Sequence, residues 1–371
     1  MATVRVGRYN YRGQFGDDPA TLIAELGDML LSGRYILTAE VEAFEAEFAA
    51  ALGVKHARGL NSGTDALIIA LRACGIVAGD EVITQANTFH ATVAAIRLCG
   101  ARPVLVDADE ASFSMDAGGL ADALTPRTRA VIPVHLYGLP APMDAVLAHV
   151  RGADVTVIED AAQAIGARID GRPVGSFGTA ACFSFHPSKN LAAAGDGGAI
   201  VTNDDDLDRQ VRRLRELGQD GQNHHVTVGL NSKLDALQAA VLKFKLPRLP
   251  EWNAARRAVA AMYRERLAGL PLGFQRVGDR EEHVYHLFQV RTERRDDLLR
   301  HLRGAGVDAV VRYPTPIHLQ PAFADVGWRK GDFPVAERLA AELLCLPIRP
   351  DLTADEIDYV ADSVRGFFRD R

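Results

Sequence analysis

ACFSFHPSKNLAAAGDGGAIVT, residues 181–202, is the stretch of sequence that says most about the fold. Two apolar runs of strand length, ACFSF and GAIVT, enclose a turn with Lys189 and a glycine-rich segment. Similar runs lie upstream at 81–85, 103–107, 130–136 and 155–160, with helical patterns between several of them. Short apolar strands that alternate with helices predict a mainly parallel sheet covered by helices on both faces.

Helical patterns extend this organisation to the rest of the chain. They lie at 88–98, 119–124, 204–218, 232–245, 252–268 and 296–305, and the helix at 204–218 opens on an acidic cap. Pro247 and Pro250 should interrupt the helix that begins at Ser232. A further strand at 286–292 indicates a smaller α+β domain. We therefore expect an α/β protein with a large domain over residues 1–248, N-terminal segment included, and a small C-terminal domain over residues 249–371.

Composition argues against several classes of protein. The 371 residues carry a net charge of −6, with no basic stretch suited to nucleic acid or a membrane surface. No apolar run reaches the roughly eighteen residues of a membrane helix, and the first residues have no signal-peptide core. Cys74, Cys99, Cys182 and Cys345 form no CxxC pair, so no metal site is expected. These features predict a cytoplasmic protein with reduced thiols that binds neither nucleic acid nor membranes.

Lys189 is the first candidate for chemistry. A single lysine is usually a solvated surface residue, but this one directly follows a buried strand, where an unpaired charge is costly. A Schiff base with pyridoxal phosphate (PLP) would resolve that cost, and burial would lower the pKa of the amine so that it can attack an aldehyde. The freed amine could then act as a general base. Ser184, at the end of the same strand, is well placed for a phosphate.

Asp160 is the second candidate, in IEDAAQAIGA at 158–167. The carboxyl end of a strand in an open α/β sheet is where ligands bind. A carboxylate there can pair with the protonated pyridine nitrogen of PLP and keep the ring an effective electron sink. Alternation along the strand sends Glu159 to the opposite face, so we assign the role to Asp160. Gln163, one turn further on, can hydrogen-bond at the ring's edge, although an isolated Glu-Asp pair at a strand end is more often a helix cap.

Ser62, Gly63 and Thr64 form a candidate phosphate site in GLNSGTDAL at 59–67. The free N–H groups and the dipole of a helix N-terminus attract a phosphate, and the two hydroxyls add donors. Gly63 lets the backbone approach the anion closely. The alternative is simple N-capping by a hydroxyl without any ligand, and a lone Ser-Gly-Thr would favour that reading.

Taken together, the motifs resemble a known family. NSGTDAL, EDAAQAIGA, FSFHPSKN, GDGGAIVT and GLNSKLDALQAAVL resemble the PLP-dependent nucleotide-sugar aminotransferases of the DegT type. The similarity runs from about Gly33 to Pro350. It implies the fold-type-I architecture of aspartate aminotransferase, with a large domain and a smaller C-terminal one. It also implies a homodimer whose active sites lie at the subunit interface.

The resemblance assigns roles residue by residue. Lys189 would carry the cofactor, Asp160 would meet its pyridine nitrogen, and Gln163 would lie near its ring oxygen. The phosphate would be held by Ser184, Gly63 and Thr64. Within ANTFHATVAA (86–95), the aromatic expected over the ring is Phe89, whose flat apolar face suits stacking, and the alternative is a core residue at helical spacing.

Later segments bear on the substrate. HVYHLFQVRTERRDDLLRHLRGAGVD (283–308) and YPTPIHLQPAF (313–323) resemble enzymes that aminate keto-deoxysugars linked to a nucleoside diphosphate, in particular C3 aminotransferases of 3-keto-6-deoxyhexoses on dTDP. Tyr313 and His318 are candidate substrate residues, and a structural loop histidine is the equal alternative for His318. Asn231 matches an asparagine that reaches the neighbouring subunit's phosphate. Lys233 stands where the family often has arginine, which leaves its role in substrate binding open.

The implied reaction is amino transfer, with L-glutamate as the donor and the nucleotide-linked keto sugar as the acceptor. The retained Lys189 argues against a related branch that has histidine there and dehydrates instead. Alternatives are a 4-keto nucleotide sugar or a cyclitol ketone as acceptor, and a non-catalytic PLP-binding regulator. A dinucleotide-dependent oxidoreductase is disfavoured because no GxGxxG follows an early strand. The segments 6–15 and 215–225 depart from the family pattern and could affect the choice of sugar.

Overall fold

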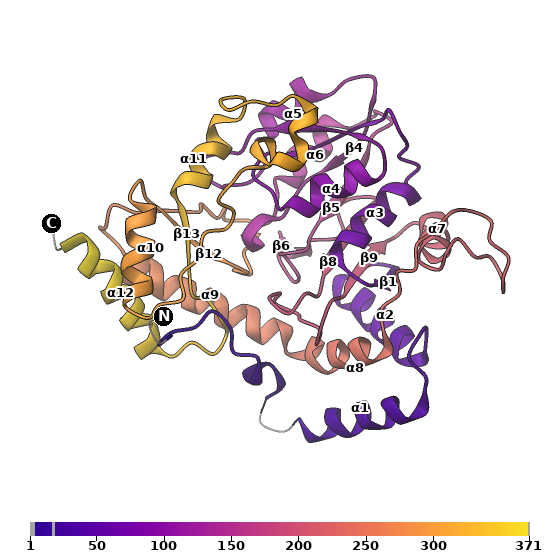
Figure 1. Cartoon of the computed structure of the whole chain (residues 1–371), viewed down its shortest axis with the longest axis horizontal. Helices are drawn as coiled ribbons and strands as arrows, with labels where there is room; N and C mark the ends of the chain where they lie inside the picture. The colour runs from indigo at the N-terminus through magenta and orange to yellow at the C-terminus, as the bar shows by residue number, and fades with distance from the viewer. Residues whose placement is uncertain (1–3, 17–18, 370–371) are drawn as a thin grey trace.

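A seven-stranded sheet forms the centre of the protein in the computed structural model, which describes residues 4–16 and 19–369 (Figure 1). In spatial order its strands are β1 (His56–Leu60), β9 (Gly198–Thr202), β8 (Ala180–Ser184), β5 (Thr156–Asp160), β4 (Thr128–Ile132), β2 (Glu81–Gln85) and β3 (Arg102–Val106). Strand β9 runs antiparallel to both of its neighbours, and the pairs from β8 to β3 are parallel. The predicted mainly parallel sheet is therefore confirmed.

Helices cover both faces of this sheet, as predicted. On one face the apolar side chains of the strands pack against α3 (Gly63–Ala73), α4 (His90–Leu98) and α7 (Asp205–Arg215). The opposite face packs against α1 (Ala20–Ser32), α2 (Ala39–Leu52), α5 (Ala117–Ala123), α6 (Met143–His149) and α8 (Ala236–Lys245). Neighbouring residues of one strand serve the two cores, because Ile158 packs with the first set and Val157 with the second.

Helix boundaries follow their capping residues, with two departures from the predictions. The Asp204 side chain accepts hydrogen bonds from the N–H groups of Asp206 and Leu207, which confirms the acidic cap of α7. Helix α8 begins at Ala236, four residues later than predicted. Pro250 lies in the first turn of α9 (Leu249–Arg266), where the missing N–H has no helical partner to lose, so it starts a helix and interrupts none.

The C-terminal part is an antiparallel three-stranded sheet with helices on it. Its strands are β10 (Gly273–Phe274), β12 (Phe288–Arg291) and β13 (Leu343–Leu346), and α9, α10 (Arg295–Gly304) and α12 (Ala354–Arg369) share its apolar core. Helix α11 (Pro334–Glu342) packs instead against residues of the large domain. Val6 pairs with Val307 and joins the apolar core of this part, so the N-terminal segment lies against it (Figure 1). The division at residue 248 falls between η3 (Leu246–Arg248) and α9 and stays a prediction.

Shorter elements connect these layers. A small sheet consists of β11 (Glu281–Glu282), β6 (Arg168–Ile169) and β7 (Arg172–Pro173). The remaining 3-10 turns are η1 (Arg12–Phe15), η2 (Leu136–Gly138), η4 (Ile317–Leu319) and η5 (Pro321–Val326). Residues 1–3 and 370–371, which the predicted domain ranges include, lie outside the described residues, as do 17–18. Within the described ranges, no helix is long and apolar enough to cross a membrane.

One edge of the central sheet gathers the ends of several elements. Strands β5 and β8 end there at Asp160 and Ser184, and β1 leads there into the N-terminus of α3. Strand β9 starts at the same edge, where a Cβ on Gly198 would lie only 2.3 Å from the carbonyl of Ser62. The close approach of these chains therefore requires a glycine at 198, and it positions the site described next.

Candidate active site

A cavity of about 340 Å³ opens at this edge of the sheet. It brings together eight predicted residues from six separate segments: Ser62, Gly63, Thr64, Phe89, Asp160, Ser184, Lys189 and Tyr313. The loops after parallel strands meet at one edge, which is why residues so distant in sequence can share a cavity. His186 also lines the cavity, together with residues that the sequence did not point to: Tyr9, Asp196, His286 and Arg312.

Lys189 sits in the turn after β8, where its backbone N–H donates to the carbonyl of His186 at 2.8 Å. Lys189 is half-buried, and desolvation lowers the pKa of its amine to about 8; the negative charge of Asp160 opposes this shift and the positive charge of Arg312 adds to it. At pH 7 a pKa of about 8 leaves roughly a tenth of the amine neutral, against roughly one part in 3,000 for an ordinary lysine. The side chain is thereby prepared to attack an aldehyde.

Asp160 is held by two hydrogen bonds at the end of β5. The hydroxyl of Thr92 donates to Oδ2 at 2.8 Å, and the N–H of Ala162 donates to Oδ1 at 3.2 Å. Burial raises the pKa of Asp160 above its usual range, while these bonds and the positive charge of Lys189 oppose the rise. Thr92 lies in the same stretch, 86–95, as Phe89. Its hydroxyl is the feature of the sequence from which a partner for Asp160 could have been predicted.

Glu159 points to the other side of the strand, which confirms the alternation used to choose between the two acids. Its carboxylate accepts the N–H groups of Gly175, Phe177 and Gly178 at 2.7–2.8 Å. His135 Nδ1 accepts from the N–H of Ala141, so its Nε2 carries the proton and donates to Glu159 at 3.0 Å. Burial opposes ionisation, but the His135 and backbone hydrogen bonds outweigh it and hold the pKa of Glu159 below its usual value. Glu159 thus anchors the 175–178 loop.

The helix N-terminus of α3 combines capping with access to the cavity. Ser62 Oγ accepts a hydrogen bond from the N–H of Asp65 at 3.1 Å, so Ser62 is the N-cap of α3, as the alternative without a ligand predicts. Ser62 also lines the cavity. A Cβ on Gly63 would lie 2.7 Å from Cβ of Ser184. Only glycine therefore lets the first turn of α3 lie this close to the end of β8, which assembles a compact set of hydroxyls and helix N–H groups.

Phe89 and Tyr313 form an aromatic pair in the cavity. Phe89 is 49% exposed, which rules out a core role for it in this chain, and its ring lies 5.3 Å from the Tyr313 ring. Gln163 does not itself line the cavity. Its Oε1 accepts the N–H of Tyr137 at 2.8 Å, and its Nε2 donates to the Tyr313 hydroxyl at 3.0 Å. Burial raises the pKa of Tyr313, so its hydroxyl keeps its proton and can donate to a ligand.

Besides Gln163, three predicted residues lie outside this cavity. Asn231 is exposed, and its carbonyl accepts from Asn61 Nδ2 at 2.9 Å. Lys233 is half-buried near it. His318 is buried, with Nε2 at 2.9 Å from Glu337 Oε1 and its ring against Phe333. Its burial and these contacts fit the alternative interpretation of His318 as a structural loop histidine.

His286 and Arg312 are functional candidates that the sequence reasoning missed. His286 is buried, and its Nδ1 has no hydrogen-bond partner among the described residues. Burial and the charges of Lys189, Arg256 and Arg312 hold the pKa of His286 far below its usual value, so the ring is neutral. Arg312 directly precedes the YPTPIHLQPAF stretch, and this position is the only feature of the sequence that indicates a functional role for it. His186 is exposed and lines the cavity, and its Nδ1 accepts a hydrogen bond from the N–H of Ser188.

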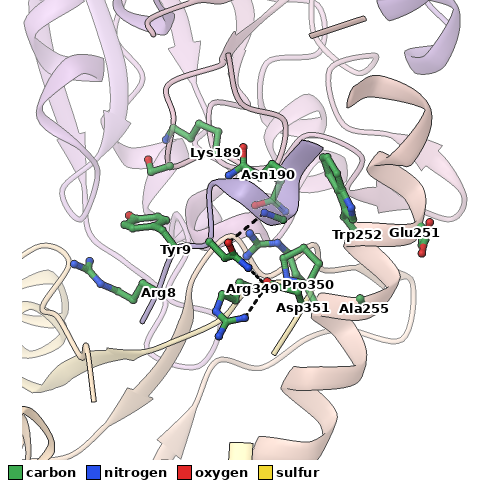
Figure 2. A pocket seen from close by; sticks show the side chains of 15 residues that line it. Arg8, Tyr9, Lys189, Asn190, Glu251, Trp252, Ala255, Arg349, Pro350 and Asp351 are labelled. Carbon is green, nitrogen blue, oxygen red and sulfur yellow. Dashed lines mark hydrogen bonds and ion pairs between the residues drawn. The ribbon is translucent and has the colours of Figure 1, made fainter. Parts of the chain in front are cut away.

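Lys189 also lines a second cavity (Figure 2). Its walls come from the N-terminal segment, α9 and the 349–351 turn, and both Lys189 and Tyr9 line the two cavities. Asn10 Nδ2 donates to Asp351 Oδ2 at 2.5 Å, and Arg349 pairs with the same carboxylate at 2.8 Å (Figure 2). These contacts tie the N-terminal segment to the C-terminal part next to the lysine.

The residues present fit each part of pyridoxal phosphate. Lys189 supplies a low-pKa amine for the aldehyde, and Asp160 supplies a carboxylate for the pyridine nitrogen. The α3 N-terminus with Ser62, Thr64 and Ser184 supplies a phosphate cradle, which the missing Cβ of Gly63 makes possible.

Comparisons with known proteins agree with this fit. A relative from Streptomyces venezuelae, named dTDP-3-amino-3,4,6-trideoxy-alpha-D-glucose transaminase, is 46% identical over 98% of this chain and 96% of that protein. The solved structure of S. venezuelae DesV in complex with a ketimine intermediate has a TM-score of 0.95 at 46% identity, over 98% of this chain and 99% of that one. The structure of ntda from Bacillus subtilis with bound cofactor pmp has a TM-score of 0.92 at 29% identity, over 100% and 86% of the two chains.

These likenesses confirm the expected fold-type-I architecture of PLP-dependent aminotransferases. The family model described as the DegT/DnrJ/EryC1/StrS aminotransferase family matches residues 17–365, nearly the whole chain. The protein therefore belongs to the DegT/DnrJ/EryC1/StrS aminotransferase family and is an aminotransferase whose cofactor is pyridoxal phosphate.

Proposed function

We propose that this protein transfers the amino group of L-glutamate to C3 of a 3-keto-6-deoxyhexose linked to a nucleoside diphosphate, in particular dTDP. The observation that carries the proposal is the meeting of Lys189 and Asp160 in one cavity, in a chain 46% identical to a dTDP-3-amino-sugar transaminase. When bound, pyridoxal phosphate accepts the amino group and withdraws electrons from the carbon that carries it.

Lys189 and Asp160 divide the catalytic work in this proposal. The amine of Lys189 attaches the cofactor and, once freed, moves the proton between the donor carbon and the cofactor carbon. The hydrogen bonds from Thr92 and Ala162 favour the ionised form of Asp160, which would balance the positive charge on the ring nitrogen. Two half-reactions then share one site, so ping-pong kinetics are expected.

The other cavity residues bind and orient. Ser62, Gly63, Thr64 and Ser184 would hold the phosphate, and Phe89 would stack on the ring. Gln163 would act at the ring's edge, directly or through the Tyr313 hydroxyl that it holds at 3.0 Å. That hydroxyl, beside Phe89, is then available to the sugar.

The proposal includes a homodimer with shared active sites. Asn231 and Lys233 lie outside the chain's own cavity, Asn231 on the surface, and would face the partner's phosphate and substrate. Several apolar side chains on and after α1 are exposed, among them Ile23 at 62% and Leu31 at 90%. A face of this kind supports association with a second copy.

Absorption spectroscopy of the purified protein tests the proposal. The lysine-bound cofactor should give a visible band that Lys189→Ala lacks, and L-glutamate should convert the wild-type cofactor to its amino form. The converted enzyme should then react with a dTDP-linked 3-keto-6-deoxyhexose and not with a 4-keto isomer or a cyclitol ketone. A preference for either alternative acceptor would refute the C3 assignment, and tight cofactor binding without turnover on any ketone would indicate a regulator.

A further inference from the structure

Tyr9 lies where the two cavities at Lys189 meet. Among the residues that the structure describes, three line both cavities: Ser188 and Lys189, which share one turn, and Tyr9, which comes from the N-terminal segment (Figure 2). Tyr9 is also the one described residue of that segment that reaches the cavity with Asp160. A molecule that reacts at Lys189 and extends from one cavity toward the other therefore meets the Tyr9 side chain.

The backbone on both sides of Tyr9 is anchored to the C-terminal part. On one side, the N–H of Arg8 donates to Asp308 Oδ2 at 3.2 Å, and Nε of the same arginine lies 3.0 Å from that oxygen. On the other side, Asn10 Nδ2 donates to Asp351 Oδ2. Because the residues before and after it are both held, Tyr9 keeps a fixed position beside the reacting amine.

The Tyr9 side chain offers an aromatic ring and a free hydroxyl to a ligand. Tyr9 is 36% exposed, and Tyr11 stacks on its ring with the two centroids 5.7 Å apart. Within residues 4–16 and 19–369, its hydroxyl has no hydrogen-bond partner. An aromatic ring packs against C–H groups, and a phenol hydroxyl can both donate and accept a hydrogen bond. A sugar ring presents these two features, C–H groups and hydroxyls, side by side.

We propose that Tyr9 determines specificity for the keto sugar, which packs against its ring and hydrogen-bonds its hydroxyl. The inference rests on the proposed amino transfer to a keto sugar. The reacting carbon is part of the sugar ring, so the ring must lie beside Lys189, where Tyr9 lines the space. L-Glutamate instead carries an ammonium and two carboxylates, and the neutral Tyr9 side chain compensates none of these charges. Tyr9 therefore acts on the sugar and not on the amino donor.

Two variants separate the contributions of the side chain, since Tyr9→Phe removes the hydroxyl and Tyr9→Ala removes the ring as well. The enzyme with its cofactor in the amino form is mixed in a stopped-flow instrument with a dTDP-linked 3-keto-6-deoxyhexose or with 2-oxoglutarate, the keto acid derived from L-glutamate. The second-order rate constant for the sugar should fall about 2- to 10-fold in Tyr9→Phe and about 10- to 100-fold in Tyr9→Ala. The rate constant for 2-oxoglutarate should stay at its wild-type value.

The ratio of the two rate constants distinguishes specificity from a structural effect. Both ketones react with the same enzyme form, so a loss of folded or cofactor-loaded protein lowers both rates and leaves the ratio unchanged. Tyr359→Phe is the control, because it removes a tyrosine hydroxyl in α12 that lies outside both cavities and donates to the carbonyl of Ala305. Its ratio should equal that of the wild type.

A folded Tyr9→Ala variant with the wild-type ratio overturns the inference, and so does an equal loss for both ketones. A wild type that converts only the 4-keto isomer contradicts the proposed C3 assignment instead, and the Tyr9 variants are then compared on that isomer. A wild type that reacts with 2-oxoglutarate but with no keto sugar contradicts the proposed function itself, whatever the Tyr9 variants do.

Discussion

Replacing Thr92 by valine should shift the pH dependence of the enzyme by a predictable amount. Thr92 is fully buried, and its hydroxyl donates to Asp160 Oδ2 at 2.8 Å. Valine keeps the shape of threonine and removes this donor, together with the 3.0 Å hydrogen bond between the Thr92 and Thr88 hydroxyls. A hydrogen bond to a charged group contributes about 1.5–3 kcal/mol, which corresponds to about one to two pKa units.

The sign follows from which form of Asp160 the hydroxyl stabilises. The bond favours the carboxylate and lowers a pKa that burial has already raised, so its loss raises the pKa of Asp160 further. Asp160 then becomes protonated at a higher pH, and the ring nitrogen loses its counter-charge there. The acidic limb of the kcat profile should therefore move up by about one to two pH units.

The assay compares wild type, Thr92→Val and Thr92→Ser. The kcat profile and the absorption spectrum of the bound cofactor are followed over the same pH range, because a merely structural effect of the substitution would not shift the spectrum. Thr92→Ser restores the hydroxyl and should return both limbs toward wild type. Coincident acidic limbs for wild type and a folded Thr92→Val variant would refute the role assigned to Thr92.

Three further predictions concern the protein before the cofactor binds. The rate of pyridoxal phosphate attachment should rise about tenfold per pH unit below pH 8 and level off above it, because the neutral amine reacts and the pKa of Lys189 is about 8. Stopped-flow absorbance measures this rate, and a rate that does not change with pH would contradict the prediction. Asp160→Asn should raise the Tm of the cofactor-free protein at pH 7, because a raised folded-state pKa makes stability fall as pH rises above the ordinary aspartate value. That advantage should vanish on acidification below the ordinary value, and an advantage that grew instead would count against it. Gly63→Ala should lower the free energy of unfolding by about 1–3 kcal/mol, because the new Cβ would contact Ser184, and it should weaken cofactor binding. Gly27→Ala is the control, because open space surrounds a Cβ there and neither effect is expected. Urea denaturation of both variants measures the difference in stability.

Much of the fold could be predicted because the information is local. Strands β8 and β9 are short, almost wholly buried and therefore nearly continuous in apolar residues, and the short apolar cores of β2 and β5 carry polar residues at their ends. Strand β1 could not be recognised, because HARGL mixes histidine and arginine with apolar residues. Its arginine, Arg58, is accommodated by Glu45 and Asp208 from two other helices, which no local pattern shows.

The candidate site divides in the same way. Asp160 is the last residue of β5, and Ser62 and Lys189 lie in the turns that follow β1 and β8, so the sequence marks them as candidates for the sheet edge. Arg312 could not be found by this reasoning, because it lies in an irregular segment far along the chain. The alternatives for His318 could not be separated either, since they depend on its contacts with Glu337 and Phe333.

The sequence by itself determined the order of strands and helices, the chemical groups at their ends and the family, since each is written in residues close together along the chain. Only the tertiary structure decided which of these groups share a cavity, which acid faces it, and that a tyrosine of the N-terminal segment lines it. The physical reason is that burial, desolvation and charge pairing depend on distances in space, and for residues far apart in sequence the packing of the sheet and its helices sets those distances.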